Sequence, residues 1–145
     1  MENLQVYYNM IDQIIREKGV DPEKCRGEKP GQWNMKRGSA NVWIDVWKLE
    51  DTDYGYLQVM APVVQIPTTN VEAFYTEILE INHKLYGVGI TKFKDWIYLK
   101  GIRELEDLSS SEANAMLNRV GVYADDYDDL LYNKYHGAKG GAPTT

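Results

Sequence analysis

Residues 42–47, Val-Trp-Ile-Asp-Val-Trp, form the pattern that most limits how this chain can fold. Successive side chains of a β-strand point to opposite faces, so the two valines and Ile44 share one face. The two tryptophans and Asp45 share the other. Branched aliphatic side chains are typical of a strand that lines a core. The tryptophan side must then be covered as well, by further chain, by a second subunit or by a ligand.

Neighbouring segments continue this second face. The turn Glu50–Asp53 joins strand 41–49 to strand 54–66, and a second hairpin joins 88–94 to 96–100. If the alternating aliphatic residues of each strand face the core, the larger residues gather on the tryptophan side. We call this set the aromatic face: Trp43, Trp47, Tyr56, Met60, Trp96 and Tyr98.

The size of the aromatic face suggests that it contacts something. Large aromatic side chains bury roughly 150–250 Å² each, so four or five uncovered rings approach ~1,000 Å². The largest exposed apolar patch of a monomer is usually about 300–600 Å². The excess favours a second subunit or a partner. The alternative is cover from within the chain, by sheet twist, by the Gln32–Trp33 segment or by the first helix.

Three amphipathic helices are predicted from apolar residues that recur every three or four positions. The first ends at Gly19, the second begins with Thr69 and Glu72 at capping-box spacing, and the third begins with Ser109 and Glu112 in the same way. Their apolar stripes are Leu4, Tyr7, Tyr8, Ile11, Ile14 and Ile15; Val71, Phe74, Tyr75, Ile78, Leu79, Asn82 and Leu85; and Ala113, Met116, Leu117, Val120, Ala124, Tyr127, Leu130 and Leu131.

Four single residues refine the predicted helices and strands. Asp12 falls on the polar side of the first helix, whereas Asn82 lies inside an apolar stripe and should bond a neighbouring backbone group. Pro62 predicts a sheet edge, a bulge or a strand end. Gly121 is a point where the third helix could bend.

The predicted order is α-β-β-β-α-β-β-α. Short connections allow antiparallel strand pairing, so we expect an α+β domain whose helices pack mainly on one face of an antiparallel sheet. Residues 1–135 form this single domain, and residues 136–145 form a disordered tail without an apolar anchor.

Composition excludes several classes of function. A formal net charge of −6 argues against nucleic-acid binding. No apolar stretch approaches the roughly 20 residues of a membrane span, and Met1–Asn3 lacks the start of a signal peptide. The single cysteine, Cys25, fits a reducing compartment. We therefore expect a cytoplasmic protein.

Catalytic or metal-binding patterns are not recognisable. His83 and His136 lack metal-ligand spacing, and the acidic runs Asp51–Asp53 and Asp125–Asp129 lack the layout of a calcium loop. Lys24 and Arg26 flank Cys25, but no second cysteine is present for a redox pair. Ser109–Ser111 is explained by helix capping, and no phosphate-binding loop follows a strand. We expect no enzyme activity, no cofactor and no metal.

Several segments in order resemble the YbjN-like family, described as sensory-transduction regulators, over nearly all of 4–135. The segments are Trp33, Val42-Trp-Ile44, Leu57-Gln-Val-Met-Ala-Pro-Val63, Phe74-Tyr-Thr-Glu-Ile-Leu-Glu-Ile-Asn82, Asp95-Trp-Ile-Tyr-Leu99, Ser109-x-x-Glu112 and Ala124-Asp125-x-Tyr127-x-x-x-Leu131. That family is similar in fold to the type III secretion chaperones, small acidic proteins that commonly dimerise and hold polypeptide segments. The resemblance implies a homodimer that binds a protein partner and is not an enzyme.

The leading hypothesis is therefore a non-catalytic, chaperone-like adaptor that forms a homodimer and binds an unknown partner protein. The aromatic face is the predicted contact surface, and the second helix, with Phe74 and Ile78, is an alternative dimer surface. The rival hypothesis is a small-ligand-binding domain with Tyr75, Asn82 and His83 as its polar groups. A third possibility is a regulatory domain of the sensory-transduction or immunity type. It would bind a partner protein in the same way as the adaptor and differ only in which protein is bound.

Overall fold

The structure, a computed structural model, describes residues 3–137, and its three helices and five strands follow the predicted order. A short 3₁₀ turn, η1, is added after the first helix. The bounds are α1 (Gln5–Glu17), η1 (Pro22–Cys25), β1 (Gln32–Arg37), β2 (Ala40–Lys48), β3 (Gly55–Gln65), α2 (Val71–Lys84), β4 (Gly89–Phe93), β5 (Trp96–Glu104) and α3 (Ser110–Tyr135).

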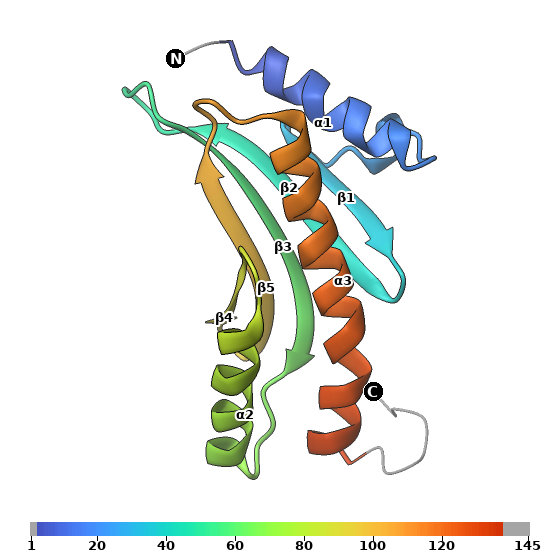
Figure 1. The fold of residues 1–145 in the computed structure, drawn as a ribbon, viewed down its shortest axis with the longest axis vertical. Coiled ribbons are helices and arrows are strands. Elements are labelled where there is room, and N and C mark those ends of the chain that lie inside the picture. The colour runs from blue at the N-terminus through green and yellow to red at the C-terminus, as the bar shows by residue number, and fades with distance from the viewer. Residues whose placement is uncertain (1–2, 138–145) are drawn as a thin grey trace.

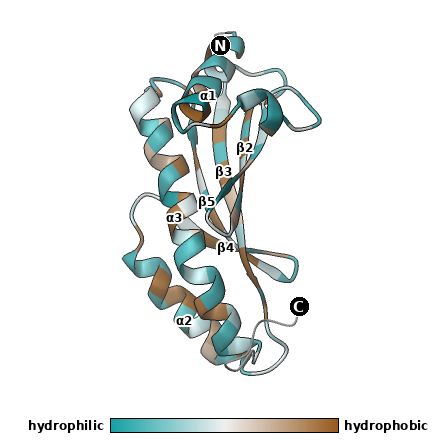
Figure 2. Ribbon diagram, turned by 90° about the vertical axis from the view of Figure 1, so that its right-hand side faces the viewer, coloured by the Kyte–Doolittle hydropathy of each residue, from teal (hydrophilic) through white to brown (hydrophobic). Residues whose placement is uncertain are grey.

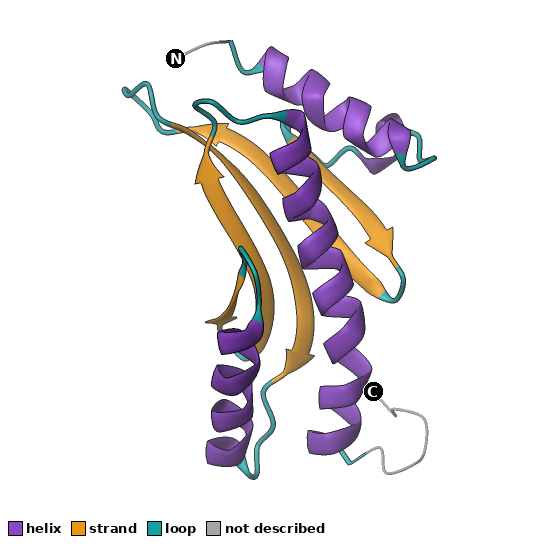
Figure 3. Ribbon diagram, in the orientation of Figure 1, coloured by secondary structure: helices purple, strands orange, loops and turns teal. Residues whose placement is uncertain are grey.

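The five strands form one antiparallel sheet in the order β1-β2-β3-β5-β4. Strand β5 returns beside β3, which leaves β4 at one edge and β1 at the other. All three helices lie on the same side of this sheet, with α3 running along its length (Figures 1 and 3). The expected α+β layering, with helices on one face, is confirmed.

The core lies between the helices and the sheet, and the predicted inward-facing strand residues form its floor. They are Val42, Ile44, Val46, Leu57, Val59, Ala61, Ile97 and Leu99, all buried. The helices cover them with Ile11, Ile14, Ile15, Phe74, Ile78, Ile81, Ala113, Met116, Leu117, Val120, Ala124 and Leu131. Two stripe residues differ from expectation, because Leu79 and Leu130 are exposed on the outer sides of their helices.

Asp12 corrects the first helix. It is not on a solvated side but buried, at 9% exposure. Its carboxylate accepts hydrogen bonds from the indole of Trp33 over 2.9 Å and from Arg26 over 2.7 Å. Trp33 itself packs on the core side of β1, at 2% exposure. The Gln32–Trp33 segment therefore does not place its tryptophan over the aromatic face.

The start of α2 also differs from the prediction. The helix begins at Val71, after Asn70 in a left-handed conformation (φ 56°), and no side chain caps it. Glu72 is then the second helical residue instead of the third, so it cannot close a capping box with Thr69. The capping box of α3 is present, with Ser109 and Glu112 bonded in both directions.

Pro62 produces a bulge, one of the three outcomes its position allowed. The register between β3 and β5 shifts between Pro62 and Val64. The ladder between β2 and β3 ends at Trp43 opposite Met60, so the proline lies beyond it. A residue without an N–H is tolerated where a ladder has ended.

The C-terminal part of α3 is tied to the sheet. Gly121 lies within the continuous helix, where a Cβ would meet the side chain of Arg37 at 2.7 Å. His136, which we assigned to the tail, lies with its ring Nε2 2.6 Å from the carbonyl oxygen of Gln65. The remaining tail, residues 138–145, lies outside the described residues.

Candidate functional site

Figure 2 shows the helices on one side of the sheet. The aromatic face lies on the other side, because its residues alternate along β2, β3 and β5 with those buried under the helices. Trp43 stands opposite Met60, and Trp47 stands opposite Tyr56, in the register of β2 and β3. The strand period alone therefore gathers these side chains on one surface.

The aromatic rings are arranged in two contacting pairs. Trp43 and Tyr98 have centroids 6.1 Å apart, although β2 and β5 are separated by β3, so these rings meet above β3. Trp47 and Tyr56 have centroids 5.7 Å apart on adjacent strands. Because each ring shields its neighbour, these four are half-buried, and the open apolar area is smaller than separate rings would expose.

A polar row separates the two pairs. Asp45 lies opposite Gln32 of β1 and Gln58 of β3, between the two tryptophans of its own strand. Burial raises the pKa of its carboxyl above the usual 3.8, and a hydrogen bond from Gln32 offsets part of this effect. The side-chain amide of Gln58 donates to the sulfur of Met60 over 3.3 Å.

Three residues of this surface were not among the predicted contacts. Asp45 was placed on the face but given no role, and Phe93 and Ile102 extend the face along β4 and β5. Both are well exposed, at 59% and 47%, compared with 37% for Trp96. Continuing the strand alternation beyond Leu99 would have found Ile102, whereas Phe93 required the position of β4.

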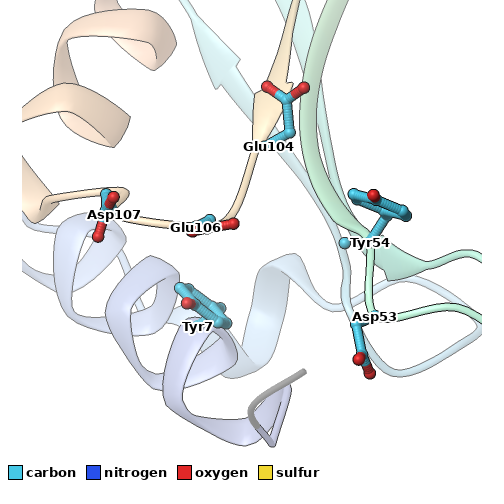
Figure 4. A pocket seen from close by; sticks show the side chains of 7 residues that line it. Tyr7, Asp53, Tyr54, Glu104, Glu106 and Asp107 are labelled. Atoms are coloured by element: carbon cyan, nitrogen blue, oxygen red, sulfur yellow. The ribbon is translucent and has the colours of Figure 1, made fainter.

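Apart from the aromatic face, a hollow of about 660 Å³ opens at the end of the sheet where α1 begins (Figure 4). Its lining is acidic and aromatic: Tyr7, Asp53, Tyr54, Gly55, Glu104, Glu106 and Asp107. The carboxylates of Asp53 and Glu104 point away from each other, so they do not converge on one point. Within residues 3–137, no group of His, Cys, Asp or Glu side chains is placed to hold a metal ion.

Comparison with known proteins identifies the fold. No family model and no curated protein matches the sequence. A chain of the ExsC–ExsE complex matches with a TM-score of 0.62 and 12% identity, over 90% of this chain and 97% of that one. The HopA1–SchA chaperone–effector complex gives 0.60 and 12%, over 85% and 93%. YbjN from E. coli gives 0.55 and 12%, over 89% and 92%. The chain has a YbjN-like, type III secretion chaperone-like fold.

Within this chaperone-like fold, Phe74 and Ile78 belong to the core of the chain itself. They are 0% and 6% exposed, and the ring of Phe74 meets that of Tyr135 edge-on at 5.0 Å. Both side chains are therefore packed inside the folded chain and do not form an outer surface. The outward side of α2 presents Leu79 instead, at 68% exposure, with Tyr86 just beyond the helix.

The polar residues of the rival ligand site are not brought together. Asn82 accepts a hydrogen bond from the backbone N–H of Ile90 over 2.8 Å, the kind of backbone bond expected from the sequence. Tyr75 packs against Phe74, while His83 is exposed and lines an open hollow without Tyr75 or Asn82. This arrangement offers no shared pocket for a small molecule.

Cys25 and the acidic run Asp125–Asp129 lie in surroundings that indicate a structural role. Burial raises the pKa of the Cys25 thiol and the charge of Asp21 raises it further, which opposes reactivity despite the flanking basic residues. Asp125 accepts from the backbone N–H of Ser39 over 2.9 Å, and Asp128 binds the Ser39 hydroxyl. This acidic run thus holds the turn between β1 and β2.

None of the helices described between residues 3 and 137 has the length and apolar character needed to cross a membrane.

Proposed function

We propose that this chain is a non-catalytic, chaperone-like adaptor that binds segments of partner polypeptides through its aromatic face. The observation that carries the proposal is the alternation of buried and half-buried residues along β2, β3 and β5, which leaves that face uncovered by the three helices. Trp43, Trp47, Tyr56, Met60, Trp96 and Tyr98 are its contact residues, none of them fully buried. Two of the similar structures are complexes, one of them between a chaperone and its effector, which supports a protein partner here.

The paired rings suit a binding role. Aromatic side chains dominate the energetics of protein interfaces because they bury large areas with few rotatable bonds. Contacts between Trp43 and Tyr98, and between Trp47 and Tyr56, hold the rings in place before a partner arrives. A pre-arranged surface loses less conformational entropy on binding.

Self-association is the second part of the proposal, and a homodimer is its expected form. Two described surfaces are available for it: the aromatic face and the outward side of α2 around Leu79. Light scattering on a size-exclusion peak tests the dimer, and a monomer at micromolar concentration contradicts it. The cytoplasmic location remains a prediction from the sequence.

Partner binding is tested with the double variant Trp43→Ala/Trp47→Ala. The tagged wild type and the variant are used to capture partners, and each captured protein is then purified and titrated against both. We expect the variant to lose at least about tenfold in affinity, because central aromatic residues contribute most to an interface. Val6→Ala, which shortens an exposed side chain of α1 outside the aromatic face and outside the α2 surface, is the control. If wild type and Trp43→Ala/Trp47→Ala capture the same proteins and bind them with equal affinity, the aromatic face is not the binding site.

A further inference from the structure

Asp45 is a carboxylate set among aromatic rings. It lies on the β2 side of the aromatic face, next to β1, between Trp43 and Trp47 of its own strand, and it is half-buried. Its one identified side-chain partner is the neutral amide of Gln32. Among the described residues, no lysine or arginine lies within ion-pair distance of it.

This environment disfavours the ionised carboxyl group. Burial raises the pKa of Asp45, and the Gln32 hydrogen bond offsets only part of that effect. Lys29 lines the same hollow but forms no ion pair with Asp45. A half-buried carboxylate without an ion pair gains when a positive charge is brought to it. The aromatic face is thus complementary to a cation at this one point.

Space for such a cation lies directly beside Asp45. An open hollow of about 430 Å³ is lined by eight residues: Lys29, Pro30, Gly31, Gln32, Asp45, Val46, Trp47 and Gln58. A guanidinium group is planar, weakly hydrated, and stacks on tryptophan faces while it bonds a carboxylate. Lysine, a compact and strongly hydrated ammonium, uses such a surface less well.

We infer that Asp45 and Trp47 form an arginine slot, which receives an arginine side chain of the polypeptide segment bound on the aromatic face. This inference rests on the proposed function of that face. Trp43, Asp45 and Trp47 repeat every second residue along β2, about 7 Å apart. An extended segment aligned with β2 has the same spacing. It would place its arginine on Asp45, and apolar residues two positions before and after it on the two ring pairs.

A second copy of the chain fits this slot less well. In a two-fold contact only the residues near the axis meet their own copies, so a second copy would reach the slot symmetrically only with the axis at Asp45. The two Asp45 carboxylates would then approach each other, and like charges at short distance are unfavourable. An arginine-bearing segment of another polypeptide places the opposite charge there.

The experiment uses two fluorescent peptides with the full chain. One has the sequence Ser-Leu-Thr-Arg-Thr-Leu-Ser, and the other replaces arginine with citrulline, which has nearly the same shape but no charge. Affinities are measured by fluorescence anisotropy with wild type, Asp45→Asn and, as a matched control, Asp126→Asn on the exposed side of α3. Circular dichroism checks that all three are folded.

Wild type and Asp126→Asn should bind the arginine peptide about tenfold more tightly than the citrulline peptide, which corresponds to one charge-assisted hydrogen bond. Asp45→Asn should bind both peptides equally. Equal binding of both peptides to wild type overturns the slot, as does a failure of wild type to bind either peptide. Loss of a wild-type dimer in Asp45→Asn, seen by light scattering, would assign Asp45 to a subunit interface and also overturn it.

A fourth variant separates this inference from the proposed function. If wild type binds both peptides equally and Trp43→Ala/Trp47→Ala binds neither, the slot is wrong but the aromatic face still binds polypeptides. If the tryptophan variant binds both peptides as wild type does, both the slot and the proposed function fail for these ligands.

Discussion

The indole N–H of Trp33 donates a 2.9 Å hydrogen bond to Asp12, and this bond joins β1 to α1 inside the protein. The same carboxylate pairs with Arg26 at 2.7 Å. Three segments that lie apart in the sequence therefore meet at one buried charge. Because Asp12 satisfies both partners, it is the point at which α1 is fixed over the edge of the sheet.

Replacing Asp12 with alanine should destabilise the protein by about 1–3 kcal/mol, because the buried Trp33 N–H would lose its acceptor, whereas the partly exposed Arg26 keeps its ion pair with Glu23. Urea unfolding followed by tryptophan fluorescence measures the loss. Asp126→Ala, which removes an exposed carboxylate, should change the free energy of unfolding by less than about 0.5 kcal/mol. A loss for Asp12→Ala as small as that of the control would contradict this account.

Ser109→Ala removes the side-chain oxygen that accepts the backbone N–H of Glu112 over 3.1 Å. We expect a loss of about 1 kcal/mol, typical of an N-cap serine. Ser111→Ala, two residues further along and inside the helix, is the control and should be nearly neutral. Equal effects of the two substitutions in thermal unfolding would argue that the capping box adds nothing to stability.

Asn82→Ala should cost about 1–2 kcal/mol, because the backbone N–H of Ile90 loses its acceptor at the edge strand β4. Asn82→Asp keeps an acceptor oxygen and should recover most of that loss. The neighbouring His83→Ala, at an exposed position, serves as the control. Hydrogen exchange of the Ile90 amide gives a local readout: it should quicken in Asn82→Ala alone, and unchanged exchange would refute the role of Asn82.

Asp45→Asn should increase the free energy of unfolding of the unliganded protein relative to wild type. This gain should be larger at about pH 7 than at about pH 4. Burial raises the folded-state pKa of Asp45 above its usual 3.8, so the folded state is penalised when the carboxyl ionises. Below 3.8 the carboxyl is protonated in both states, and the penalty disappears. Urea unfolding across this range tests the trend, and a gain that grows as the pH falls would contradict the sign.

Cys25 should react slowly in the folded protein. Burial and the nearby charge of Asp21 both raise the pKa of its thiol, which lowers the fraction of reactive thiolate. We expect the thiol reagent dithiobis(nitrobenzoate) to modify Cys25 at least about tenfold more slowly in the folded protein than in denaturant. Similar rates in the two conditions would indicate an accessible thiol and would reopen a redox role.

Local patterns in the sequence were sufficient for much of the fold. The alternation of residues 42–47 separated an aliphatic from an aromatic face, because a period of two allows a side chain only two directions. The capping box at Ser109 was predictable for a similar reason, since its two partners are three residues apart. Asn70 shows the limit of such reasoning: a helix start one residue later cancels a capping box whose spacing is otherwise correct.

Contacts across the sheet required the tertiary structure. Trp43 and Tyr98 lie far apart in sequence, and they meet only because β5 returns beside β3 and the two rings reach over that strand. Asp12 occupies a position that helical periodicity assigns to the polar side, yet β1 places the Trp33 indole against it. A periodic pattern describes one element and carries no information about which neighbour lies opposite.

The sequence by itself determined the order of the elements and which strand residues share a face. It did not determine which face the helices would cover, since both faces of β2 carry large apolar side chains. The tertiary structure decided this by placing α1, α2 and α3 on the aliphatic side. Branched aliphatic residues pack closely against helices, and the tryptophan side, with its half-buried Asp45, was left uncovered by the three helices.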